Sequence, residues 1–92
     1  MPAIITFVYP IIRDDFIYKS LQTLYKYTDK SKFKVIIIDQ TIHGLDKDLL
    51  IIEPDMIIRM KNQGFACAAN TGLRVGLSWG TPYLGVINDD TE

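Results

Sequence analysis

Four short runs of apolar residues, most of them β-branched or aromatic, constrain the fold of this chain more than any other feature. They occupy residues 3–9, 33–39, 56–60 and 83–87, and Pro10 is expected to close the first run. None of the four alternates strictly between apolar and polar residues, which is typical of strands that are buried on both faces in parallel sheets. The sequence therefore predicts four strands of a mainly parallel sheet.

Two longer stretches between these runs have helical periodicity. Residues 14–28 begin with two acids and repeat an apolar residue every three or four positions, and residues 65–79 repeat one every four positions. Gly80 lies just past the second stretch and Pro82 prevents its continuation, so both favour a helix end there. Residues 46–50 are compatible with one short helical turn.

The order of these elements predicts the fold class. Strands that alternate with helices need crossover connections, and an open, mainly parallel sheet with helices on both faces satisfies them. We expect one α/β domain over residues 1–92, Rossmann-like and three-layered, with an irregular stretch between the second and third strands.

Composition indicates which kinds of partner and which cellular compartment to expect. Ten basic and eleven acidic side chains give a net charge of −1, which does not indicate a nucleic-acid-binding surface. No apolar stretch approaches the roughly 20 residues of a membrane span. The amino end has no basic region or cleavage site of a signal peptide, and a single cysteine excludes an internal disulfide framework. A cytoplasmic location is therefore expected.

Polar residues follow the predicted strands where each strand ends. Asp39 ends the second run, Asn62 follows the third, and Asp89 and Asp90 follow the fourth. In a parallel sheet these ends share one edge, where ligands bind. Such acids also occur simply because they favour turns. A carboxylate there suits a hard divalent cation such as Mg²⁺, which is commonly shared with substrate phosphates.

Two Asn-x-Gly pairs, at Asn62–Gly64 and Asn70–Gly72, flank a run of small residues. Glycines there allow either close backbone approach to a ligand or tight packing of a helix on the sheet. The chain has neither a GxxxxGK[ST] phosphate loop nor a GxGxxG motif after the first strand. These absences argue against a kinase-like NTPase and against an ordinary dinucleotide-dependent oxidoreductase.

Taken in order, the motifs resemble the amino-terminal half of the family 2 glycosyltransferases of the GT-A type. The segment NQGFACAANTGL at 62–73 is similar to the Asn/Gly/Ala signature of that family, and YLGVINDDTE at 83–92 is similar to its metal-motif strand. The strand that ends in Asp39 resembles the family's strand ending in an acid. The resemblance extends over essentially the whole chain.

The resemblance implies a nucleotide-diphosphate sugar as donor substrate and transfer of its glycosyl group to an acceptor hydroxyl. By position, Asp39 would hold the base or ribose, and Asn62 and Gly64 would line the nucleotide pocket. Asp89 would lie against the ribose or around the metal, and Asp90 would ligate Mn²⁺ or Mg²⁺ at the diphosphate.

Tyr9 and Asn70 complete the predicted nucleotide-sugar site. The acceptor and the catalytic base remain unknown, because the family's corresponding parts lie further along the chain than Glu92. We therefore expect a glycosyltransferase domain truncated after the metal motif and inactive alone.

Two other readings remain open, together with a prediction about association. The chain could be a small receiver-like signalling module in which Asp39 accepts a phosphoryl group, although the first strand lacks the acids such a module needs at its end. It could also be a structural fragment that binds no ligand. In the fold of the resembled family further strands cover the fourth strand, so here residues 83–87 are expected to form an exposed apolar edge that pairs with a second copy.

Overall fold

The computed structural model describes residues 4–13, 17–46 and 54–87. Within these ranges the chain forms one four-stranded sheet, two α-helices and one turn of 3₁₀-helix. In chain order they are β1 (Ile5–Ile11), α1 (Ile17–Tyr27), η1 (Lys30–Lys32), β2 (Phe33–Asp39), β3 (Met56–Arg59), α2 (Phe65–Trp79) and β4 (Tyr83–Val86).

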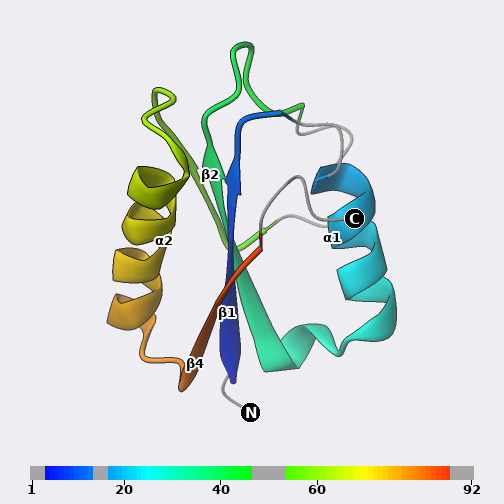
Figure 1. Ribbon diagram of the computed structural model, residues 1–92. Helices are drawn as coiled ribbons and strands as arrows, with labels where there is room; N and C mark the ends of the chain where they lie inside the picture. Colours follow the sequence, from blue (N-terminus) through cyan, green and yellow to red (C-terminus); the bar gives the residue numbers. More distant parts are fainter. Residues whose placement is uncertain (1–3, 14–16, 47–53, 88–92) are drawn as a thin grey trace.

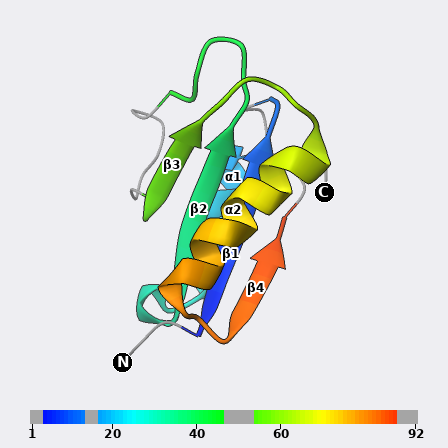
Figure 2. The same cartoon turned by 90° about the vertical axis from the view of Figure 1, so that its left-hand side faces the viewer.

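The sheet has the order β3-β2-β1-β4, and every neighbouring pair is parallel. The chain adds β2 and β3 on one side of β1 and then returns to place β4 on the other. Helix α1 covers one face and α2 the opposite face, which gives three layers (Figure 1). All four strands point the same way, so their carboxyl ends share one edge (Figure 2). The predicted open, parallel α/β fold is confirmed.

Each face of the sheet has its own apolar core. Under α1 the buried side chains are Tyr9, Ile11, Ile17, Leu21, Phe33, Val35 and Ile37. Under α2 they are Val8, Ile36, Ile38 and Ala68. Successive residues of β2 therefore alternate between the two cores, and this explains why its sequence is continuously apolar. No helix in the described part of the chain is long and apolar enough to cross a membrane.

Strand β1 continues through Pro10, so the prediction that this proline closes the strand is wrong. Val8 O accepts a hydrogen bond from Ile87 in the direction of β4, and Ile11 O accepts one from Gln40 in the direction of β2. By alternation, the nitrogen of Pro10 faces β4, but pairing of β1 with β4 ends at Val8. The missing N–H is therefore not needed for pairing in the sheet.

Helix α2 spans the predicted residues and packs closely on β1 through Gly72. A Cβ atom at Gly72 would clash with the buried side chain of Val8. The helix ends at Gly80, whose φ of 74° is left-handed and whose N–H bonds to Leu77 O. These glycines thus serve packing and capping.

The remaining boundaries differ slightly from prediction. Strands β3 and β4 are each one residue shorter than expected at their carboxyl ends, and α1 is described from residue 17 to 27. Residues 14–16 and 47–53, which include the predicted acidic cap and most of the predicted turn at 46–50, lie outside the described residues. The 3₁₀ turn was not predicted; Asp29 caps it by accepting hydrogen bonds from the N–H and hydroxyl of Ser31.

Candidate functional site

Asp39 and Arg59 form the centre of the polar edge at the carboxyl ends of the strands. They are the last residues of β2 and β3, and the parallel register pairs them directly. Paired residues of neighbouring strands project their side chains to the same face. Here Arg59 Nη1 lies 3.3 Å from Asp39 Oδ2, and the carboxylate is buried while the arginine side chain is half exposed.

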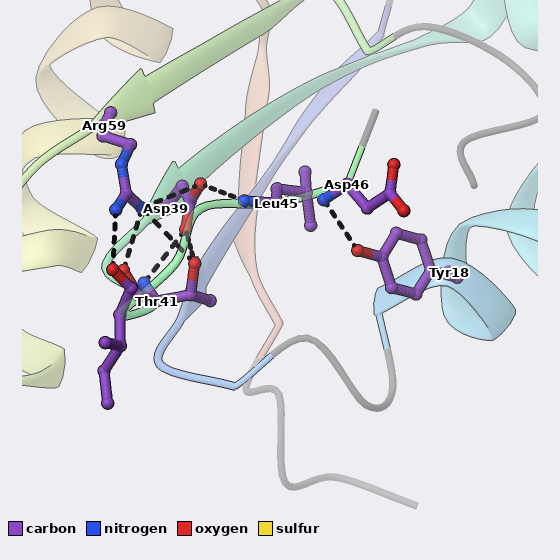
Figure 3. Close-up of polar contacts among 7 residues, drawn as sticks. Tyr18, Asp39, Thr41, Leu45, Asp46 and Arg59 are labelled. Atoms are coloured by element: carbon purple, nitrogen blue, oxygen red, sulfur yellow. Dashed lines mark hydrogen bonds and ion pairs between the residues drawn. The ribbon is translucent and has the colours of Figure 1, made fainter. Parts of the chain in front are cut away.

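The Asp39 carboxylate is fully engaged within the chain (Figure 3). Oδ1 accepts hydrogen bonds from the N–H and the hydroxyl of Thr41, at 3.0 and 2.6 Å. Oδ2 accepts a hydrogen bond from the N–H of Leu45 at 2.8 Å and pairs with Arg59. An ionised carboxylate offers about four lone-pair positions, and these four contacts occupy them.

These contacts also set the charge state of Asp39. Burial alone would raise the pKa of its carboxyl, because the charged form is then poorly solvated. The hydrogen bonds from Thr41 and Leu45 and the charge of Arg59 outweigh burial, and the pKa lies below its usual value. Asp39 is therefore ionised at neutral pH and serves as an anchor for the loop that follows β2.

That loop, residues 40–46, is held at both ends. Arg59 donates hydrogen bonds to the carbonyl oxygens of Thr41 and Ile42, at 2.8 and 3.2 Å. Gly44 has a φ of 86° and lies against the guanidinium, where an added Cβ would be 3.5 Å from Arg59 Cζ. Further along, the N–H of Asp46 donates a hydrogen bond to Tyr18 Oη of α1 (Figure 3).

Gln40 projects to the opposite face of the sheet from Asp39, toward the start of α2. Its Oε1 accepts a hydrogen bond from the N–H of Gln63 at 3.0 Å. This contact fixes the orientation of the side-chain amide, because a flipped amide would place two donors together. Gln40 is only 4% exposed, and among the described residues its Nε2 has no hydrogen-bond partner. It is a buried, unsatisfied donor.

A pocket of about 420 Å³ opens beside this amide. Its walls come from the ends of β2 and β3 and the residues that follow each strand: Gln40, Thr41, Ile42, Arg59, Met60, Lys61 and Asn62. Asp39 is not among them, because its side chain is turned into the loop. The pocket thus lies at the predicted edge of the sheet, between β2 and β3.

The side chains that line the pocket include several hydrogen-bond donors, among them the amides of Gln40 and Asn62. The side-chain oxygens of Gln40 and Asn62 each already accept one hydrogen bond, from the N–H groups of Gln63 and Gly64. Arg59 and Lys61 carry positive charge, and Lys61 has no ion-pair partner within the described ranges. The pocket is therefore suited to a ligand rich in acceptors and negative charge.

The predicted site residues do not all gather at this pocket. Asn62 lines it, and Gly64, with a φ of 92°, begins α2 beside it. Tyr9 lies instead in the core under α1, where burial raises its pKa and a hydrogen bond with Ser20 lowers it less. Asn70 is exposed on α2 and does not line the pocket. Asp39 is close to the pocket and does not line it; it holds Thr41 and Arg59, which do.

Asp89 and Asp90, the predicted ribose and metal residues, lie outside the described residues. Within residues 4–13, 17–46 and 54–87, no three His, Cys, Asp or Glu side chains come together in a way that could hold a metal ion. The metal prediction therefore depends on the sequence of residues 88–90 alone.

Of the residues that line the pocket only Asn62 was predicted; the polar residues that were not are Gln40, Thr41, Arg59 and Lys61. Arg59 carried a visible signal, because it is the one charge within an apolar run that is otherwise MII and M. Its register opposite Asp39 needs the strand order, which the sequence did not supply. Comparisons of the chain with protein-family models, curated proteins and solved structures gave no match.

Proposed function

We propose that this chain binds a nucleotide-diphosphate sugar at the carboxyl edge of its sheet, as the nucleotide-binding part of a metal-dependent glycosyltransferase of the family 2 type. The observation that carries the proposal is the pocket at the ends of β2 and β3, whose lining includes the cations Arg59 and Lys61 and, among the described residues, the unpartnered amide nitrogen of Gln40. A nucleotide diphosphate offers the matching chemistry, with acceptors on its base and ribose and negative charge on its phosphates.

The charge balance of the pocket supports an anionic ligand. Asp39 offsets the charge of Arg59, but no described acid offsets Lys61. Asn62 also lies two residues before Gly64, the N-cap of α2, so the positive end of the helix dipole is close to the pocket. Lys61 and the start of α2 together favour an anionic ligand in this pocket.

The metal part of the proposal comes from the resemblance at residues 88–90. Asp90 would ligate Mn²⁺ or Mg²⁺ and Asp89 would lie around it or against the ribose. A divalent cation there would offset the charge that builds on the diphosphate leaving group. The chain's own contribution is to bind and orient the donor for transfer to an acceptor hydroxyl; the acceptor and catalytic base are not assigned.

A receiver-like module has less support. Phosphorylation of Asp39 needs a carboxylate oxygen that can attack a phosphoryl donor, but both oxygens are buried and occupied by Thr41, Leu45 and Arg59. An attack would first have to break the contacts that hold the loop after β2. A labelling experiment with a small phosphoryl donor tests this alternative directly, and we expect no incorporation at Asp39.

Calorimetric titration with UDP and GDP, each with and without MnCl₂, tests the proposed function. We expect binding that strengthens with Mn²⁺, loses that strengthening in Asp90→Ala and weakens in Lys61→Ala. Asp46→Asn, which removes an exposed acid near the same edge, is the control and should bind as the unchanged chain does. Binding indifferent to metal and to Asp90 would refute the metal assignment, and no binding of either nucleotide would refute the function.

A further inference from the structure

The unsatisfied amide of Gln40 indicates how the proposed site distinguishes its ligands. Gln40 lines the pocket, is 4% exposed, and has an Nε2 group that no described residue accepts from. A buried donor without an acceptor is costly to a folded protein. Such a group stays compatible with the fold when a ligand supplies the acceptor, and the neighbouring pocket is where a ligand would do so.

The orientation of the Gln40 side-chain amide is fixed. Gln40 Oε1 is held by the N–H of Gln63, so the amide cannot turn over to present its oxygen to the pocket. Asn62 is held in the same way by the N–H of Gly64. In each amide the oxygen therefore already accepts one hydrogen bond, and in Gln40 the nitrogen is left without a partner among the described residues.

Asp39 is not available to accept a hydrogen bond from the base of a nucleotide. Contact with a ring N–H would need one of its carboxylate oxygens, but these are filled by Thr41, Leu45 and Arg59. Its side chain is also on the face of the sheet away from Gln40 and is not part of the pocket wall. Contacts with a base must then come from the residues that line the pocket, where the Gln40 amide nitrogen has no partner among the described residues.

We propose that Gln40, and not Asp39, reads the base of the nucleotide, and that it selects bases with an oxo group over bases with an amino group at the same ring position. This inference rests on the proposed function and names the class of base that the site takes. An oxo group accepts the hydrogen bond that Nε2 offers. An amino group would place two donors together and leave both unpaired, and such a mismatch strongly disfavours the wrong ligand.

Two pairs of ligands test the inference, because each pair exchanges an oxo group for an amino group and, with it, the adjacent ring N–H for a bare ring nitrogen. UDP and CDP differ by oxo against amino on a pyrimidine, and IDP and ADP differ in the same way on a purine. By calorimetry with MnCl₂ present, we expect the oxo member of each pair to bind at least about tenfold more tightly. Both comparisons use the unchanged chain and need no variant.

The variant Gln40→Glu gives the sharper test. Glutamate keeps the oxygen that accepts from Gln63 and replaces the free donor by an acceptor, so the ratio of UDP to CDP affinity should fall at least about tenfold. The titration is done at pH 8 to keep the new carboxyl ionised. Gln40→Met, which has neither donor nor charge, should bring the ratio close to one. Gln22→Glu, on the exposed face of α1, adds the same charge elsewhere and should leave the ratio unchanged.

The outcomes separate this inference from the function it rests on. Equal binding of UDP and CDP, tighter binding of the amino base, or a ratio that Gln40→Met leaves unchanged would overturn the reading by Gln40 while nucleotide binding stands. Failure of all four nucleotides to bind would overturn both. If circular dichroism shows that Gln40→Glu does not fold, Gln40→Met and the two ligand pairs decide the matter.

Discussion

Asp39 Oδ1 accepts two hydrogen bonds from the same residue, Thr41, one from its N–H at 3.0 Å and one from its hydroxyl at 2.6 Å. The chain therefore turns back on itself directly after β2, and the aspartate side chain is withdrawn from the ligand edge. Thr41 then presents its carbonyl oxygen to Arg59. This small turn links the end of β2 to the end of β3 and shapes one wall of the pocket.

Loss of the Asp39 charge should destabilise the fold. Asp39→Asn places an amide N–H₂ group against the N–H of Leu45 or of Thr41, and we expect a loss of about 1–3 kcal/mol in the free energy of unfolding. Thr41→Val, which removes only the hydroxyl contact, should cost about 1 kcal/mol. Urea unfolding followed by circular dichroism measures both. A loss below about 0.5 kcal/mol in Asp39→Asn, the size of an ordinary surface change, would contradict this account.

The depressed pKa of Asp39 predicts a dependence of stability on acid. Because its folded pKa is below its unfolded value, the stabilisation is present above about pH 3.8 and is lost as the pH falls through the folded pKa. The difference in unfolding free energy between the unchanged chain and Asp39→Asn should therefore be constant from pH 7 to pH 5 and shrink toward pH 2. A difference that stays constant down to pH 2 would show that the ionised carboxylate is not the stabilising form.

Tyr25 predicts the opposite behaviour in alkali. Burial, followed by the nearby charge of Asp55, raises its pKa to about 12, and among the described residues its buried hydroxyl has no hydrogen-bond partner. Its contribution to stability is therefore full below pH 10 and is lost as the pH rises toward 12. Tyr25→Phe should remove this loss, and at pH 7 it should leave stability unchanged or raise it by up to about 1 kcal/mol. A clear loss of stability at pH 7 would mean that the hydroxyl has a partner.

Much of the fold was predictable because it depends on local pattern. The apolar run 33–39 and the helical repeat 65–79 coincide with β2 and α2, since burial on both faces and a four-residue repeat each leave a direct mark in sequence. The end of β1 was not predictable in this way. Whether Pro10 can remain in a strand depends on where pairing with β4 stops, and that is set by residues more than 70 positions away.

The site was predictable in position but not in the roles of its residues. The edge and Asn62 follow from parallel topology and from strand ends. The fold of the loop 40–46 decides the roles of Asp39 and Gln40. It brings Thr41 and Leu45 into hydrogen-bond contact with Asp39, and it leaves the amide nitrogen of Gln40 without a partner among the described residues. The bond from the N–H of Thr41 to Asp39 is an Asx turn, which an aspartate there favours, but the contacts with Leu45 and Arg59 join Asp39 to residues further along the chain and have no local pattern.

Gly72 should be a packing residue whose replacement is costly despite its place in a helix. Alanine usually stabilises a helix interior by about 1 kcal/mol relative to glycine. Here the new methyl group would meet Val8, which is rigid, β-branched and fully buried, so we expect a net loss of about 1–3 kcal/mol. In a double-mutant cycle with Val8→Ala, the loss from Gly72→Ala should become smaller. Additive losses would show that the two residues do not meet.

The outer edge of β4 should pair with a second copy of the chain. Within the described residues β4 has a neighbour on one side only, and its exposed residues Tyr83 and Val86 are apolar. Since the N–H groups of Tyr83 and Ile87 point toward β1, alternation directs that of Val86 outward, where it can join another strand. Light scattering at increasing concentration should show a dimer. Val86→Lys should weaken it, whereas Leu77→Lys, an equally drastic change at an exposed position of α2, should not; a monomer at every concentration would exclude pairing through this edge.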